Sequence, residues 1–303
     1  MMKSAEVRYN NQVKKLLADP QVLTRILKGT VEEFSDMSLK DIAAALGDSI
    51  EVSEEESFLT EHALVHMDAQ ESFIPGEGLI VYDIKCTAKL TDKTVDIIIN
   101  VEAQKSSKTS ELGYPLDKRI IYYLSRLISE QKNTYFYHKD YGKIRKVVSI
   151  WICMDTAADE DSINEIHLTQ KSLFGEKLKL DNLDLMRAYV VSIRKNDDVE
   201  KSKNSLIAML EDLLSAKDIE EKKNILHDEH QMVMFEFLEG GVSDMCNLSD
   251  LIKEDGLKEG IATERIATIV RMLKKNFSYE TIKELDYTDE EIKRAEESML
   301  INV

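Results

Sequence analysis

Residues 81–107 have the sequence VYDIKCTAKLTDKTVDIIINVEAQKSS, in which two stretches rich in Val, Ile and Thr flank the polar pair Asp92-Lys93. Two such stretches around a short polar turn predict a β-hairpin, here over residues 79–105. A turn with an even number of residues centred on this pair places Asp83 directly opposite Glu102. An odd-numbered turn would shift the register by one residue and put the two acids on opposite faces of the sheet.

The alternation of apolar and polar residues favours the even register. One face of the hairpin is then apolar throughout and consists of Tyr82, Ile84, Cys86, Ala88, Ile97, Ile99, Val101 and Ala103. The other face carries Asp83, Lys85, Asn100, Glu102 and Gln104. Because side chains alternate between the two faces of a strand, we expect the first face to be core and the second to hold the functional groups.

A pair of facing carboxylates needs a physical reason. Directly opposed like charges destabilise a sheet by up to ~1 kcal/mol. Water screens this repulsion if the face is open, and the pair then has no function. The alternative is a divalent cation between the oxygens of Asp83 and Glu102, because carboxylates are ligands that such ions prefer. Spacing alone leaves both interpretations open.

The rest of the chain predicts an α/β core followed by helices. Helical patterns cover residues 5–46, with a break at Pro20, and residues 117–132. Short apolar runs at 146–154 and 185–193 are typical of buried strands. After about residue 200 only helical patterns remain; one is expected to end at Gly240-Gly241, and Ser278 and Thr288 are expected to cap two short helices. We therefore expect an α/β domain over residues 1–200 and a helical region over 201–303.

Composition indicates a soluble globular protein. The chain has 303 residues, of which 43% are hydrophobic, and three scattered cysteines that form no metal-like or redox pair. No run of about 18 apolar residues is present, so we expect no membrane span. The first residues lack the apolar core of a signal peptide, which predicts a cytoplasmic protein. No glycine-rich phosphate loop occurs, and no small-molecule organic cofactor is expected.

The negative charge of the chain is unevenly distributed. The formal net charge of −17 argues at first against nucleic acid as a partner. Residues 31–77 hold thirteen acidic side chains and one basic one, whereas residues 101–150 hold ten basic and five acidic side chains. A basic patch directly after the hairpin is therefore compatible with DNA as a partner.

These motifs, in this order, resemble the PD-(D/E)XK nuclease superfamily. Its signature is an Asp on one strand and an acidic-x-Lys or acidic-x-Gln on the paired strand. YDIKC supplies Asp83, and IINVEAQ supplies Glu102 and Gln104. More narrowly, the chain resembles the bacterial group of recombination-promoting nucleases and putative transposases, through NQVKKLLADPQVLTRILK, DKRIIYYLSRLISEQ and VVSIWIC. The resemblance covers roughly residues 10–195, with a looser match in the helical tail.

The resemblance implies a restriction-endonuclease-like core, a mixed sheet flanked by helices, and a metal-dependent DNA endonuclease linked to recombination or mobile DNA. It implies that Asp83 and Glu102 bind one or two Mg²⁺ ions, or Mn²⁺ as a substitute, with the carbonyl of Ala103 as a further ligand. Gln104 would orient the attacking water or a phosphate oxygen. Two departures are Tyr82, where the superfamily name has proline, and Gln104, where it has lysine.

Gln104 carries no charge, so another residue would have to supply a cation for catalysis. Lys85 lies on the polar face two residues from Asp83 and is the candidate; the alternative is a salt bridge that only neutralises Asp83. Candidate contacts to the nucleic-acid backbone on the next helix are Lys118, Arg119, Tyr122 and Arg126. A solvated helical face is the alternative for these four residues.

Three classes of function remain open. The facing Asp83 and Glu102 favour a Mg²⁺-dependent endodeoxyribonuclease. Gln104 and the net acidity favour a catalytically weak protein with the nuclease fold, which acts as a nucleic-acid-binding or protein-binding module. The third class is an acidic interaction protein whose helical tail pairs with a second copy, which would make a homodimer.

Overall fold

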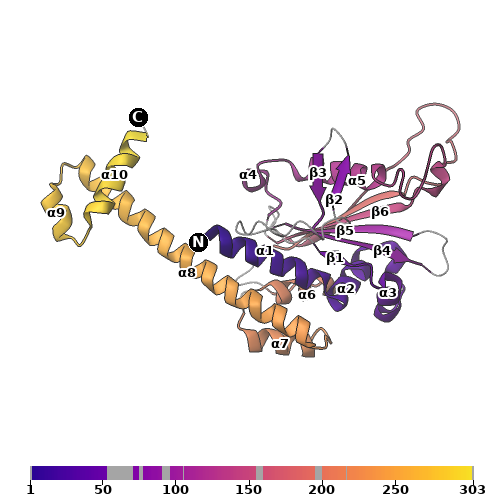
Figure 1. Cartoon of the computed structure of the whole chain (residues 1–303), viewed down its shortest axis with the longest axis horizontal. Coiled ribbons are helices and arrows are strands. Elements are labelled where there is room, and N and C mark those ends of the chain that lie inside the picture. Colours follow the sequence, from indigo (N-terminus) through magenta and orange to yellow (C-terminus); the bar gives the residue numbers. More distant parts are fainter. Residues whose placement is uncertain are drawn as a thin grey trace. The chain divides into compact units, whose positions relative to one another are not determined.

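A six-stranded mixed β-sheet forms the centre of the larger part of the protein (Figure 1). The structure is a computed structural model and describes residues 2–52, 71–74, 78–90, 96–104, 106–154, 160–194, 200–215 and 217–301. The chain divides into two compact units: one is Val7–Cys246, and the other is Met1–Glu6 together with Asn247–Val303. The sheet and the paired acids belong to the first of these units.

The strands follow the order β1-β4-β5-β6-β8-β7 in the sheet. Their bounds are Glu51–Val52 for β1, Ile84–Lys89 for β4, Asp96–Gln104 for β5, Lys146–Cys153 for β6, Ser162–His167 for β7 and Met186–Ser192 for β8. Strands β5, β6 and β8 run parallel, whereas β1 is antiparallel to β4, β4 to β5, and β7 to β8. The carboxyl ends of β5, β6 and β8 therefore share the end of the sheet at which β4 begins.

The pairing of β4 with β5 has the even register that the sequence predicts. Lys85 pairs with Asn100, and Lys89 pairs with Asp96. The turn at Asp92-Lys93 lies outside the described residues, so the register is defined by the strands on either side of it. Continued beyond the start of β4, the same register brings Asp83 beside Glu102.

The first strand of the hairpin is shorter than expected from the sequence. The chain bends at Asp83, and β4 begins only at the next residue. The residues before the bend form β3 (Gly78–Val81), which pairs with β2 (Glu71–Ile74) in a separate two-stranded sheet. The expectation of one continuous strand from residue 79 is therefore wrong, because the start of that stretch hydrogen-bonds to a different partner.

The bend also changes the face on which Tyr82 lies. Its ring packs edge-on against Tyr123, with ring centroids 5.7 Å apart, in the cluster that includes Trp151. Ile84, in contrast, belongs to the core cluster on the other side of the sheet. The expectation that Tyr82 and Ile84 share an apolar face is wrong, since the two residues do not belong to one regular strand.

Helices from both ends of the larger unit cover one face of the sheet (Figure 1). They are α1 (Met2–Ala18), α2 (Pro20–Thr30), the 3-10 turn η1 (Glu32–Phe34), α3 (Leu39–Leu46), α6 (Ser205–Leu214) and α7 (Ile219–Asp228). The break expected at Pro20 separates α1 from α2, where Asp19 caps the second helix by accepting the N–H of Gln21. Leu16 of α1 and Leu210 of α6 lie in the same core cluster, so residues distant in sequence share this layer.

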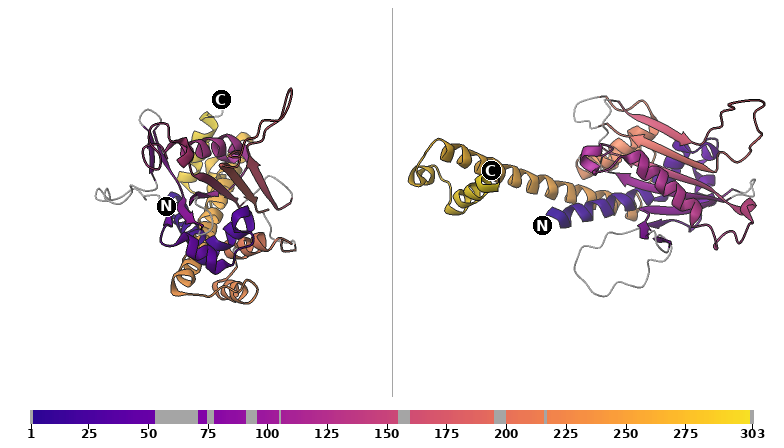
Figure 2. Two further views of the ribbon diagram at one scale, coloured as in Figure 1. Left: turned by 90° about the vertical axis from the view of Figure 1, so that its right-hand side faces the viewer. Right: turned by 90° about the horizontal axis from the view of Figure 1, so that it is seen from above.

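Helix α5 (Leu116–Ser129) covers the opposite face of the sheet (Figure 2). The contact joins Ile120, Tyr123, Leu124 and Leu127 of α5 to Ile98, Val147, Trp151 and Ala188 of the sheet. The face on which the sequence places polar groups is therefore also buried, and both Asn100 and Glu102 lie in the interior. Polar side chains buried between a helix and a sheet need hydrogen-bond or ionic partners within the protein, because burying them without such partners costs free energy.

Helix α8 (Glu236–Lys274) runs through Gly240 and Gly241, where a helix end was expected. The preceding helix already ends at Asp228. A Cβ atom on Gly241 would lie 2.8 Å from Cδ2 of Leu16 in α1, so any side chain there would clash. Gly241 therefore allows two helices to pack closely and does not terminate one.

The unit formed by Met1–Glu6 and Asn247–Val303 also contains α9 (Tyr279–Glu284) and α10 (Asp289–Ile301). The expected caps are present: Ser278 accepts the N–H of Thr281, and Thr288 and Glu291 exchange the two hydrogen bonds of a capping box. A small core holds these helices together and consists of Ile269, Ile282, Ile292 and Ala295. Among the described helices, none combines the length and the apolar character that crossing a bilayer requires.

The boundary between the compact units lies at Cys246–Asn247. Helices α6 and α7 and the first part of α8 therefore pack with the sheet, and their apolar residues belong to its core. The division into a nuclease-like domain over 1–200 and a helical region over 201–303 stays a prediction about where the functional domain ends.

Candidate functional site

Asp83 and Glu102 interlock at the end of the sheet where β4 begins and β5 ends. The backbone N–H of Asp83 donates a hydrogen bond to Oε1 of Glu102 over 3.1 Å. In return, the backbone N–H of Ala103 donates to Oδ2 of Asp83 over 2.9 Å. Each carboxylate thus accepts an N–H from the segment that carries the other one, and the structure brings the two acids together as the register indicated.

The buried position of Glu102 disfavours its charged form. Its side chain is only 1% exposed. Burial, and then the negative charge of Asp83, raise the pKa of Glu102 to about 8, although the N–H of Asp83 and the charge of Arg119 act in the opposite direction. The carboxyl therefore tends to hold a proton near neutral pH, and an added positive charge would release that proton.

Two cationic side chains from helices on opposite faces reach the acidic pair. Nζ of Lys14, on α1, lies 2.9 Å from Oδ1 of Asp83. Nη2 of Arg119, on α5, lies 3.5 Å from Oε2 of Glu102. The side chain of Lys14 is 5% exposed, so water screens its ion pair only weakly. The site is thus a cluster of two acids and two cations at one end of the sheet.

Lys14 was not identified from the sequence. It lies in the segment NQVKKLL, beside Val13 and close to Leu16, both of which are buried in the core. A lysine next to the apolar stripe of a helix is the one signal that could have pointed to it. That signal is weak, because most such lysines extend their amine to solvent.

Arg119 is held in a cage of aromatic side chains. It donates hydrogen bonds to the hydroxyl groups of Tyr114 and Tyr123, and its guanidinium carbon lies 5.3 Å from the ring of Trp151. Its Nη1 also donates to Oε1 of Gln104 over 3.4 Å. Burial opposes its charge, but the hydrogen bond with Tyr123 and the charges around it raise the pKa of Arg119 above its usual range. The guanidinium is therefore a fixed positive charge beside Gln104.

Lys85 pairs with a carboxylate other than the one considered from the sequence. Its Nζ lies 2.8 Å from Oε1 of Glu130, and 5.1 Å from the centre of the Tyr82 ring. The hydroxyl of Tyr82 donates to the second oxygen of the same glutamate over 3.2 Å. In the described structure, Lys85 thus joins the start of β4 to the end of α5. Its catalytic role stays a prediction.

The residues of α5 expected to contact nucleic acid differ in exposure. Lys118 is exposed, and Tyr122 is 44% exposed, so both can reach a partner at the surface. Arg119 is partly buried in its aromatic cage. Arg126 is 1% exposed, and its guanidinium is therefore out of reach of a phosphate at the surface. Arg119 and Arg126, seven residues apart, lie on one side of α5, and that side faces the sheet.

The acidic pair has the chemistry that a divalent cation requires. Oε2 of Glu102 is buried and accepts no hydrogen bond from any described residue; its contact with Nη2 of Arg119, at 3.5 Å, is an ion pair without hydrogen-bond geometry. A buried carboxylate oxygen in this state is costly, and native structures rarely leave one without a reason. A cation held between Glu102 and Asp83 would satisfy that oxygen and offset the repulsion between the two acids. These residues therefore fit such an ion.

A second acidic cluster lies between α6 and α7. Asp212, Glu229 and His230 bring ligand-type atoms within 4.8 Å of one another. The oxygens of Asp212 are already engaged, by Lys217 on one oxygen over 2.9 Å, and by Lys201 and His230 on the other over 2.9 and 2.8 Å. These partners lower the pKa of Asp212 against the effect of its burial. The cluster is an ion-pair network rather than an available metal site.

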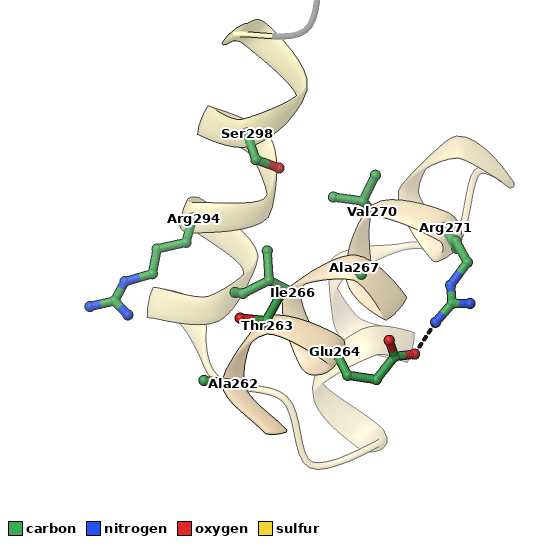
Figure 3. A pocket seen from close by; sticks show the side chains of 9 residues that line it. All are labelled: Ala262, Thr263, Glu264, Ile266, Ala267, Val270, Arg271, Arg294 and Ser298. Carbon is green, nitrogen blue, oxygen red and sulfur yellow. Dashed lines mark hydrogen bonds and ion pairs between the residues drawn. The ribbon is translucent and has the colours of Figure 1, made fainter. Parts of the chain in front are cut away.

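The C-terminal unit contains a shallow groove of about 650 Å³ between α8 and α10 (Figure 3). Its apolar part consists of Ala262, Ile266, Ala267 and Val270. Arg271 and Arg294 lie on opposite sides of it, and they pair with Glu264 and Glu290, respectively. Both arginines are exposed and already form ion pairs. The residues that line the groove therefore include no buried charged group comparable to Asp83 and Glu102.

More than half of the chain matches a known protein family. A family model described as PD-(D/E)XK nuclease family transposase matches residues 62–239, which include Asp83, Glu102 and Gln104 but not Lys14. No curated protein and no solved structure matches the chain. With its mixed sheet flanked by helices and helices alone in the described residues after β8, the chain has the expected restriction-endonuclease-like α/β fold with a helical extension.

Proposed function

Because the chain belongs to the family of PD-(D/E)XK nuclease transposases, we propose that it is a metal-dependent DNA endonuclease linked to recombination or mobile DNA. The reaction is hydrolysis of a phosphodiester bond, and the partner is DNA. The observation that carries the proposal is the interlocked pair Asp83 and Glu102, in which one buried carboxylate oxygen accepts no hydrogen bond from the described residues.

Asp83 and Glu102 hold the divalent cation in this proposal, with the carbonyl oxygen of Ala103 as a third ligand. The chemistry that Mg²⁺ or Mn²⁺ supplies there is polarisation of the scissile phosphate and activation of a water molecule for in-line attack. Gln104 orients that water or a phosphate oxygen through its amide, since it can donate and accept hydrogen bonds but carries no charge. The contact with Arg119 fixes the position of the amide.

The accessible residues of α5 serve DNA binding. Lys118 supplies a charge to the phosphate backbone, and Tyr122 offers an exposed ring and hydroxyl on the next turn of the helix. Arg119 lies deeper, beside Glu102, where it contributes to the site by holding the amide of Gln104 in position. Arg126 is left out of this interface because it is buried.

Plasmid cleavage tests the proposal directly. Supercoiled plasmid is incubated with the purified full chain and Mg²⁺ or Mn²⁺, beside the variants Asp83→Ala and Glu102→Ala, with EDTA as the metal-free control. We expect nicked or linear product from the unmodified protein and none from either variant. Glu165 is exposed on β7, which is an edge strand of the sheet. Glu165→Ala serves as a carboxylate control and should leave cleavage unchanged. Cleavage that survives both substitutions in the pair would remove this site from the mechanism.

A catalytically weak nuclease-fold protein that binds nucleic acid or another protein is the second candidate. The neutral Gln104 and the ion pairs that occupy both acids favour it. It predicts that labelled DNA is retained in the presence of metal while no cleavage product forms. A homodimer and a cytoplasmic location are further predictions, which size-exclusion chromatography with light scattering and cell fractionation test.

A further inference from the structure

The site lacks a charged residue at the position where Gln104 stands. A phosphodiester gains negative charge as a nucleophile attacks it, and a fixed positive charge nearby stabilises that state. An amide can orient atoms but cannot supply this charge. Another side chain of the chain must therefore provide it if the site is catalytic.

The described structure offers three cations near the acids, and their contacts separate them. Lys85 is held by Glu130 at the end of α5. Arg119 donates hydrogen bonds to two tyrosine hydroxyls and to Gln104, and these contacts hold it in place beside Glu102. Of these three cations, Lys14 is the one that contacts the carboxylate of Asp83, with Nζ 2.9 Å from Oδ1.

The position of Lys14 is set by the core. Its neighbours Val13 and Leu17 on α1 are fully buried and pack in the main core cluster, which also includes Ile84 and Val101 beside the acids. The lysine itself is 4% exposed. Burying a charged lysine costs free energy unless the charge is paired. The ion pair with Asp83 explains why Lys14 is tolerated between α1 and the sheet.

We propose that Lys14 is the cationic residue that positions Asp83: its buried ion pair with Oδ1 holds that carboxylate and sets the charge of the site, where Gln104 carries none. The inference rests on the proposed nuclease function, and it assigns to α1 a role for which the sequence pointed to Lys85. Lys14 acts on the site through Asp83, so it is a positioning residue.

A distinctive consequence follows from the shared oxygen atoms. Lys14 and a divalent cation both bind the carboxylate of Asp83. The ion pair with the lysine therefore lowers the affinity of the site for metal, although the lysine aids the reaction. Removing its charge should therefore tighten metal binding and slow cleavage at the same time. A residue with a purely structural role would weaken both, because both depend on the same folded site.

The test compares Lys14→Met, Lys14→Arg and Lys85→Met with the unmodified protein. The matched control is Lys146→Met: Lys146 has the same 4% exposure and pairs with Glu33 and Asp184, but it begins β6 at the opposite end of the sheet. Mn²⁺ affinity is measured without DNA by isothermal titration calorimetry, and plasmid cleavage is measured at saturating Mn²⁺. Thermal unfolding checks that each variant folds, and Lys14→Gln replaces Lys14→Met if the methionine variant does not fold.

We expect Lys14→Met to bind Mn²⁺ about tenfold more tightly and to cleave at least about a hundredfold more slowly. Lys14→Arg should keep the metal affinity of the unmodified protein and recover part of the cleavage, because it keeps the charge. Lys146→Met should change neither. Lys14→Gln, which also removes the charge, should give the same two changes as Lys14→Met.

Several outcomes would overturn the assignment. Unchanged Mn²⁺ affinity in folded Lys14→Met means that the lysine does not compete for Asp83. Cleavage that is lost in Lys85→Met but retained in Lys14→Met assigns the charge to Lys85. If the unmodified protein cleaves no DNA, the proposed function fails, and the metal titration still decides whether Lys14 and the cation share Asp83.

Discussion

Glu102 on β5 is paired directly with Trp151 on β6 in the parallel ladder of the sheet. Trp151 is the single tryptophan of the chain, it is fully buried, and its ring also contacts Arg119. Paired residues of neighbouring parallel strands point to the same face, so the indole lies beside the proposed metal site. The chain thus carries an intrinsic fluorescent reporter at this position.

Metal binding should therefore change tryptophan fluorescence. Titration with Mn²⁺, a paramagnetic quencher, should lower the emission of Trp151 in a saturable way, and Mg²⁺ should compete with it. Asp83→Ala and Glu102→Ala should abolish the saturable phase. Fluorescence that decreases equally in both variants would show that Mn²⁺ acts elsewhere.

The stability of the metal-free protein should depend on pH through Glu102. Its folded pKa, about 8, lies above the unfolded value of 4.5, so the folded state binds this proton more tightly. The stabilisation is fully present below pH 4.5 and is lost as the pH rises through about 8. Urea unfolding in EDTA at several pH values between 5 and 9 measures this loss.

Glu102→Gln should flatten that dependence, because the amide does not titrate. Glu111→Gln, an exposed carboxylate on the short helix before α5, serves as the control and should leave the profile unchanged. A profile of Glu102→Gln that falls as steeply as that of the unmodified protein between pH 5 and 9 would contradict the assignment of the shift to Glu102.

Gly241→Ala should destabilise the larger unit, whereas Gly240→Ala should not. The new Cβ at Gly241 would lie 2.8 Å from Leu16 and force α8 away from α1, at a cost of about 1–3 kcal/mol. At Gly240 no atom lies within 4 Å of the new Cβ, so the higher helix propensity of alanine should stabilise α8 by up to ~1 kcal/mol. The free energies of unfolding in urea measure both effects, and equal values for the two variants would be evidence against close packing at Gly241.

Lys118→Ala and Arg126→Ala should have different effects on DNA binding and stability. Loss of the exposed Lys118 should weaken DNA binding for all sequences and reduce the salt dependence of the affinity by about one phosphate contact. Arg126 is buried, so its loss should lower the free energy of unfolding by about 1–3 kcal/mol. Filter binding in Ca²⁺ at several salt concentrations, beside thermal unfolding, separates the two. Arg126→Ala with normal stability but weak DNA binding would return that residue to the interface.

The hairpin register could be predicted from the sequence, because apolar alternation keeps Ile97, Ile99 and Val101 on a common face with Ile84 only in registers shifted by an even number of residues, and a short turn centred on Asp92-Lys93 selects one of these. That local rule was sufficient to bring Asp83 and Glu102 together. Helix caps such as Thr288 with Glu291 were equally predictable, since they depend on residues three positions apart.

Tertiary structure decided what surrounds the two acids. Lys14 is separated from Asp83 by most of the N-terminal region, and Glu130, which pairs with Lys85, lies at the C-terminal end of α5. Neither ion pair follows from a local sequence pattern. The register of a hairpin is set by neighbouring side chains. The positions in which α1 and α5 pack on the two faces of the sheet depend instead on the whole core. The sequence by itself therefore determined which carboxylates meet, and only the folded chain decided which cations join them.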